Sequence, residues 1–237
     1  TLGNTVARMG TESGGGGGVI WLGPSEPTLM DYFTLVGSSA ELPLENGCPD
    51  RVLEVSATPL LLTAENEASV RISNPAFSLA LDLLTPWSKL NFDTVSYLVK
   101  RAFYAPLSWS FTDEKLQAPP FYRSTNLPAG KTQVAAYYSK GERSFQVSLS
   151  RPIWNQLPLL DQAGLLIHEA LRQVQLGYGN DFNDEGLQRS TAIYLLCAPS
   201  VRLNLYLFYI LNNSPEGADK IYGPFPEFIQ HECRRAR

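Results

Sequence analysis

The sequence predicts an α+β fold in which a helix-rich first part precedes a small antiparallel hairpin packed on a long helix. Two alternating runs, "KTQVAAYYS" and "RSFQVSLS", are separated by a short turn containing Gly141, which is typical of a β-hairpin. Apolar residues recur at helical spacing before and after this pair. The 237 residues suffice for one large domain, and a composition of 44% hydrophobic and 18% charged residues is that of a chain with a packed core.

We expect a flexible Gly-rich leader over residues 1–26 and a single domain over residues 27–237. Five glycines, Gly14 to Gly18, precede the apolar run "VIWL" and lack the lysine of a phosphate-binding loop. They therefore indicate a mobile segment before the first strand. The domain is expected to be helix-rich over 27–126 and to carry the hairpin and further helices over 127–237.

Several segments of the first part have helical patterns. "PTLMDYFTLVG" predicts a short helix with Pro27 near its first turn and Gly37 at its end. "PAFSLALDLLTPWSKL" and "NFDTVSYLVKRAFYA" are also helical in pattern, whereas residues 51–72 leave helix and strand open.

In the second part, the hairpin is followed by three predicted helices. The first extends from near Pro158 to Gly177, the second ends before Pro199, and the third begins after Ser200 as its N-cap. The final stretch, "GPFPEFIQHECRRAR", is expected to be a proline-punctuated tail.

Charge and hydropathy exclude some classes of partner. The net charge of -4 and a pI of about 5.3 argue against nucleic acid or an anionic membrane as partners. No apolar run reaches the roughly 18 residues of a membrane span. The three cysteines allow at most one intramolecular disulfide, whose pairing stays open: Cys48, Cys197 and Cys233.

The long helix begins its central stretch "IHEALR" like the helix of a zinc peptidase. His168 and Glu169 match the start of His-Glu-x-x-His, in which two histidines bind zinc and the glutamate deprotonates the zinc-bound water. Arg172 occupies the position of the second histidine, and a guanidinium is a permanent cation without a lone pair to donate. A zinc site would need His168 together with ligands from elsewhere: His231 and a carboxylate such as Asp181, Asp184 or Glu185. Catalytic zinc is therefore the weaker hypothesis, and no cofactor is expected.

A structural interpretation explains these residues better. Glu169 and Arg172, at i and i+3, can form an ion pair on a half-buried helix. Alternatively, each pairs with a group on the next helix, such as Arg189 or Ser190, because buried polar groups need partners. The expected polar network comprises His168, Glu169, Arg172, Arg189 and Ser190.

Residues 127–174 resemble a group of uncharacterised exported proteins common in predatory bacteria of the Bdellovibrio kind. The matching positions are Leu127, Pro128, Gln133, Ala135, Tyr137, Trp154, Leu157, Gln162, Ala163, His168, Glu169 and Ala170, followed by Arg189 and Ser190. Asp31 and Tyr32 match the opening of that group, whereas the Asn and Asp of its Gly-rich motif are missing and Lys131 replaces a common cysteine. The resemblance implies a secreted or periplasmic protein, and the polar, Gly-rich start is typical of a mature exported chain.

The order of hairpin, connector and His-Glu helix also resembles the core of zincin peptidases, in which an edge strand runs above the active helix. This resemblance implies a zincin-like packing whose metal site has been lost, and it implies little about function.

Two hypotheses follow for the function. In the first, the protein is a non-catalytic pseudoenzyme, periplasmic or delivered into prey, that binds a protein or cell-envelope component. The aromatic residues of "APPFYRS" or "YGPFPEF" then supply contact surface or belong to the core. In the second, the protein is a zinc-dependent hydrolase with a rearranged site, in which His168 binds the metal and Glu169 is the general base.

Overall fold

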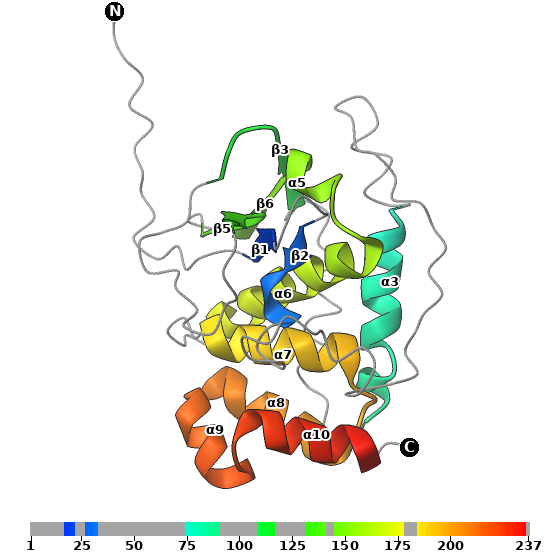
Figure 1. The fold of residues 1–237 in the computed structure, drawn as a ribbon, viewed down its shortest axis with the longest axis vertical. Coiled ribbons are helices and arrows are strands. Elements are labelled where there is room, and N and C mark those ends of the chain that lie inside the picture. Colours follow the sequence, from blue (N-terminus) through cyan, green and yellow to red (C-terminus); the bar gives the residue numbers. More distant parts are fainter. Residues whose placement is uncertain are drawn as a thin grey trace, which may run out of the picture.

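The computed structural model describes residues 17–21, 27–32, 74–90, 109–116, 131–140, 145–177 and 184–235. This part of the chain is helix-rich and carries small sheets, so the α+β class is confirmed. Figure 1 shows the strands gathered at one end, α6 and α7 across the middle, and α8 to α10 at the other end. No helix in the described ranges is both long and apolar enough to cross a membrane.

The strands form two three-stranded sheets within the described residues. The first has the order β2-β1-β4 and is antiparallel, and the second has the order β3-β6-β5. In the second sheet β3 is parallel to β6, and β5 is antiparallel to it. The strands are β1 (Gly18–Trp21), β2 (Thr28–Leu29), β3 (Trp109–Thr112), β4 (Lys131–Val134), β5 (Ala136–Lys140) and β6 (Phe145–Ser150).

The predicted hairpin is present as β5 and β6, with Ala136 opposite Leu149 and Tyr138 opposite Val147. The first predicted run is divided, however, because its start, β4, pairs with β1 in the other sheet. Ala135 lies at the division and connects both sheets: its N–H donates to the carbonyl of Gly17 at 3.0 Å, and its carbonyl accepts from Ser150 at 2.7 Å. One continuous segment thereby belongs to two sheets.

The helices follow the expected start and stop signals closely. They are α3 (Pro75–Leu84), α5 (Arg151–Trp154), α6 (Leu159–Gly177), α7 (Asp184–Leu196), α8 (Val201–Asn212), α9 (Pro215–Tyr222) and α10 (Phe225–Arg235). Asn74 caps α3 by accepting from the N–H of Ala76, and Ser200 caps α8 by accepting from the N–H of Leu203 at 3.1 Å. The limits predicted for the long helix agree with α6.

Three predictions need correction. The segment beginning at Pro27 is strand β2 followed by a short 3-10 helix, η1 (Met30–Tyr32), because β2 pairs with β1. The flexible leader does not extend to residue 26, because residues 18–21 are the central strand of the first sheet. The tail after Gly223 is helix α10, whose Phe225, Phe228 and Ile229 are buried.

Other predictions lie outside the described residues: the helix over "NFDTVSYLVKRAFYA", the stretch 51–72, Cys48 and the aromatics of "APPFYRS". The predicted helix "PAFSLALDLLTPWSKL" is present as α3 and a 3-10 turn, η3 (Trp87–Lys89).

Helix α6 is the centre of the core and packs against α3, α7, β2 and β5. Gly164 permits close contact on its buried face. A Cβ atom at this position would lie 2.6 Å from Cδ2 of Leu29 and 2.8 Å from Cδ1 of Leu195. The absence of a side chain therefore lets β2 and α7 approach α6 at the same level.

Gly164→Ala is expected to lower the free energy of unfolding by about 1 kcal/mol. Overpacking a core costs about 1–3 kcal/mol, which exceeds the gain of about 1 kcal/mol from replacing glycine within a helix. Urea denaturation measures the change, with Ser78→Ala on the exposed side of α3 as a control that adds no core atom. A variant at least as stable as the wild type would contradict this packing.

Candidate functional site

The candidate site lies on one face of α6, which carries His168, Glu169 and Arg172. All three side chains are fully buried, with relative exposures of 0%. The helix is anchored at its start by Gln162, whose amide donates to the carbonyls of Trp154 at 2.8 Å and Leu157 at 3.2 Å. These contacts fix the turn between α5 and α6. They therefore help to position the polar residues of α6 relative to the strands.

The imidazole of His168 lies between a carboxylate and a guanidinium. Its Nδ1 is 2.6 Å from Oδ1 of Asp31, which is itself fully buried on η1. Its Nε2 is 3.3 Å from Nη2 of Arg172. Because an arginine nitrogen can only donate, a hydrogen bond to Nε2 uses the neutral ring with its proton on Nδ1, donated to Asp31. Both ring nitrogens are thus engaged by protein groups.

The charges around His168 favour its protonation. Burial disfavours the charged ring, but the charge and hydrogen bond of Asp31, together with the charge of Glu169, outweigh it and raise the pKa of His168 above 6.5. Arg172 acts in the opposite direction. Protonation would place an N–H on Nε2 as well, so the contact with Arg172 is a hydrogen bond only when the ring is neutral, whereas the contact with Asp31 is made in both states.

Glu169 is held by the start of the first sheet. Its Oε1 accepts from the N–H of Gly17 at 2.5 Å, and its Oε2 lies 4.0 Å from Nε of Arg172. A Cβ atom on residue 17 would lie 2.2 Å from Cδ1 of Leu165, so glycine allows the backbone to come this close to α6. The predicted i, i+3 ion pair is therefore present as a long contact beside a shorter bond to the backbone.

A third contact joins α6 to the same N-terminal segment. Asp161, in the first turn of α6, accepts from the N–H of Leu29 at 3.1 Å. Gly17, Leu29 and Asp31 are thus bound to α6 at three places, through Glu169, Asp161 and His168. Together these contacts form what we call the α6 polar cluster: Asp31, Asp161, His168, Glu169 and Arg172.

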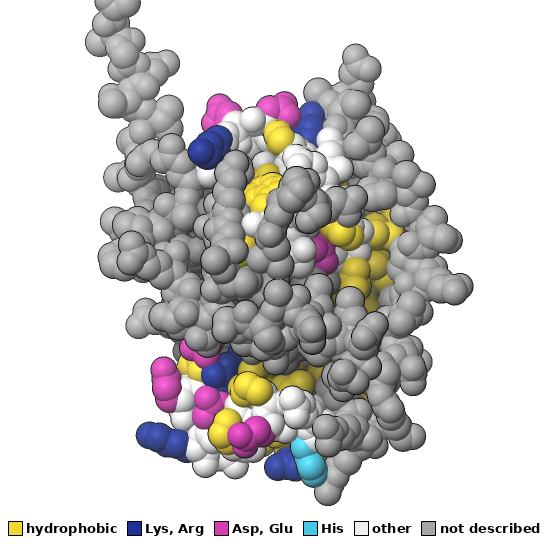
Figure 2. All heavy atoms as spheres, viewed as in Figure 1, with side chains coloured by type: hydrophobic (Ala, Val, Ile, Leu, Met, Phe, Trp, Pro, Cys, Tyr) yellow, Lys and Arg dark blue, Asp and Glu magenta, His cyan; other side chains and the backbone are white. Residues whose placement is uncertain are grey.

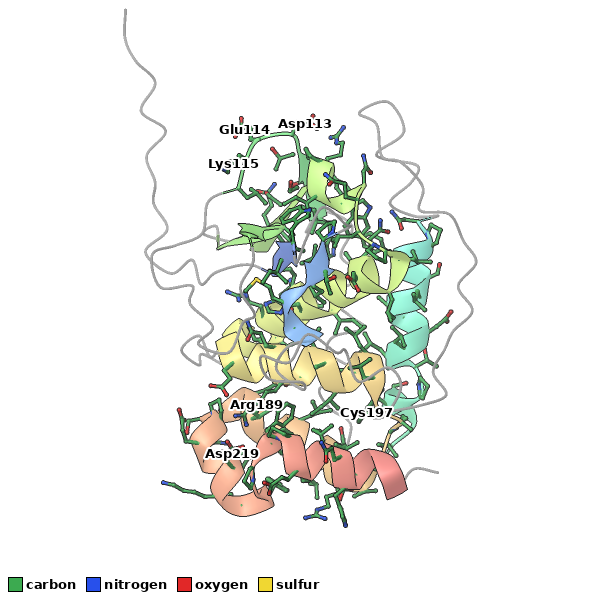
Figure 3. The ribbon with its side chains drawn as sticks, viewed as in Figure 1. Asp113, Glu114, Lys115, Arg189, Cys197 and Asp219 are labelled. Carbon is green, nitrogen blue, oxygen red and sulfur yellow. The ribbon has the colours of Figure 1, made fainter. Side chains whose placement is uncertain are left out.

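Arg189 belongs to a different set of interactions. It donates to Asp219 and Glu185, each at 2.6 Å, and to the hydroxyl of Tyr206 at 3.1 Å. Figure 3 shows Arg189 and Asp219 facing each other between α7 and α9. Ser190, the next residue of α7, is fully buried, and no hydrogen bond links its hydroxyl to a described residue. The structure therefore joins three of the five predicted network residues and places Arg189 in an ion-pair group that fixes α9.

Burial and neighbouring charges shift the pKa values of this second group. Burial works against the charged guanidinium, but hydrogen bonds to Asp219 and Tyr206 outweigh it and raise the pKa of Arg189. Burial raises the pKa of Tyr206 to about 12, despite the opposing effect of Arg189. The phenol therefore stays neutral at physiological pH and serves as a hydrogen-bond acceptor.

The described residues contain no set of three His, Cys, Asp or Glu side chains positioned to hold a metal ion. His231 lies on α10 beside Glu232, with its side chain 53% exposed, while His168 is fully buried. Glu185 pairs with Arg189, and Asp181 lies outside the described residues. The side chains proposed as additional zinc ligands are therefore not gathered at His168 in the part of the chain described.

Two residues that contact the polar side chains of α6, Asp31 and Gly17, were not predicted from the sequence to do so. Asp31 and Gly17 lie 137 and 152 residues from the side chains that they contact. The only sequence signal for Asp31 was its match to the opening of the exported proteins. The glycine run gave no indication that one of its members accepts and donates hydrogen bonds within the core.

Comparisons of the chain with protein-family models, with curated proteins and with solved structures each find no match. The interpretation of the site therefore depends on its own geometry.

Stability is expected to depend on pH through His168. Because its pKa is raised by folding, the stabilisation is fully present below about pH 6.5 and is lost as the pH rises through the folded-state pKa. Urea unfolding from about pH 6 to about pH 9 should show the wild type losing stability relative to His168→Gln, which cannot titrate. His231→Gln, at a half-exposed position, is the matched control. Parallel curves for wild type and His168→Gln would refute this assignment.

Glu169→Ala is expected to lower the free energy of unfolding by about 1–3 kcal/mol, because it leaves the N–H of Gly17 buried without its acceptor. Glu185→Ala removes a half-exposed ion pair with Arg189 and should cost less than about 1 kcal/mol. Chemical denaturation of both variants gives the comparison. Equal losses would show that burial does not distinguish the two carboxylates.

Proposed function

We propose that this chain is an exported, non-catalytic protein on a scaffold like that of zincin peptidases, and that it acts by binding a protein or cell-envelope component. The observation that carries the proposal is that both ring nitrogens of the buried His168 contact protein side chains. Arg172 stands beside the imidazole where a metal-binding peptidase would need a second lone-pair donor.

The positions of Glu169 and His168 argue against a catalytic role. A general base needs hydrogen-bonding access to a water or substrate proton. Glu169 is fully buried and bound to the backbone of Gly17, and both nitrogens of His168 face protein groups. Oε1 of Glu169 and Nδ1 of His168 thus have a structural use, because they hold Gly17 and Asp31 against α6.

A zincin-like packing is supported by the position of the hairpin. Strand β5 contacts α6 directly, and the connector through α5 leads from β6 into α6, in the order that the resemblance implies. The residues matched to the exported group also meet in space: Asp31 binds His168, and Gln162 binds the carbonyls of Trp154 and Leu157. This agreement supports a common scaffold for that group, in which the matched residues hold the core together.

Binding is supported by the distribution of exposed apolar side chains. Within the described residues, the large hydrophobic side chains that are exposed belong to α8 and α9: Val201, Leu205, Phe208 and Ile221. By contrast, Phe225 and Phe228 of "YGPFPEF", considered above as contact residues, are core. Val201, Leu205 and Phe208 are spaced at i, i+4 and i+7 and so share one face of α8, and an exposed apolar patch is typical of an interaction site.

The metal content of the purified protein tests the proposal. Prepared without chelator and measured by inductively coupled plasma mass spectrometry, the protein should carry zinc well below one equivalent, and His168→Ala should not change that amount. Stoichiometric zinc that disappears in His168→Ala or in the milder His168→Gln, together with peptide hydrolysis that disappears in Glu169→Gln, would establish the zinc-dependent hydrolase instead.

A further inference from the structure

We draw no further inference here: the strongest candidate, the exposed surface patch of Val201, Leu205 and Phe208 on α8, lies in the C-terminal part, where hydrophobic side chains reach the surface among charged ones (Figure 2), and nothing in the described residues shows what covers it.

Discussion

The α6 polar cluster is the constraint on which the remaining structure depends. Asp31, His168, Glu169 and Arg172 are completely removed from solvent, so they must satisfy one another or the backbone. Burying ionisable groups in this way costs free energy unless groups of opposite charge lie close by, and here Arg172 lies beside Glu169 and His168 beside Asp31. The bonds that achieve this come from two segments of the N-terminal region, Gly17 and η1, and they determine where the first sheet stands on α6.

Glycines make this arrangement sterically feasible. Gly17 leaves room for Leu165 and lets the backbone reach Glu169, and Gly164 leaves room for Leu29 and Leu195. The polar contacts and the close packing thus occur along the same length of α6. The hydrogen bonds between the N-terminal segment and α6 form only because the two backbones lie close together. Without these hydrogen bonds, the same close packing would bury unpaired N–H donors.

Local sequence signals predicted the features that depend on residues close together in the chain, namely helix limits and the β-hairpin. Proline and serine caps gave the limits of α6 and the start of α8, and alternation gave the β5–β6 pairing. The same reasoning could not find that β4 leaves the hairpin for β1, that β3 joins β6, or that Asp31 meets His168, because each depends on partners distant in sequence. The segment after Pro27 has a helical pattern and yet pairs as a strand, since pairing with β1 outweighs its weak propensity.

Arg172 occupies the position at which a His-Glu-x-x-His helix carries its second histidine. A histidine at this position would offer a second metal ligand, but it would leave the carboxylates of Glu169 and Asp31 without a permanent cation in a buried environment. The arginine supplies that cation and at the same time occupies the second ring nitrogen of His168. Stability and metal binding therefore make opposite demands on one residue. Under the proposed function, recognition is therefore expected away from this face of α6, and α8 lies beyond α7 from this cluster, with Val201, Leu205 and Phe208 exposed (Figure 1).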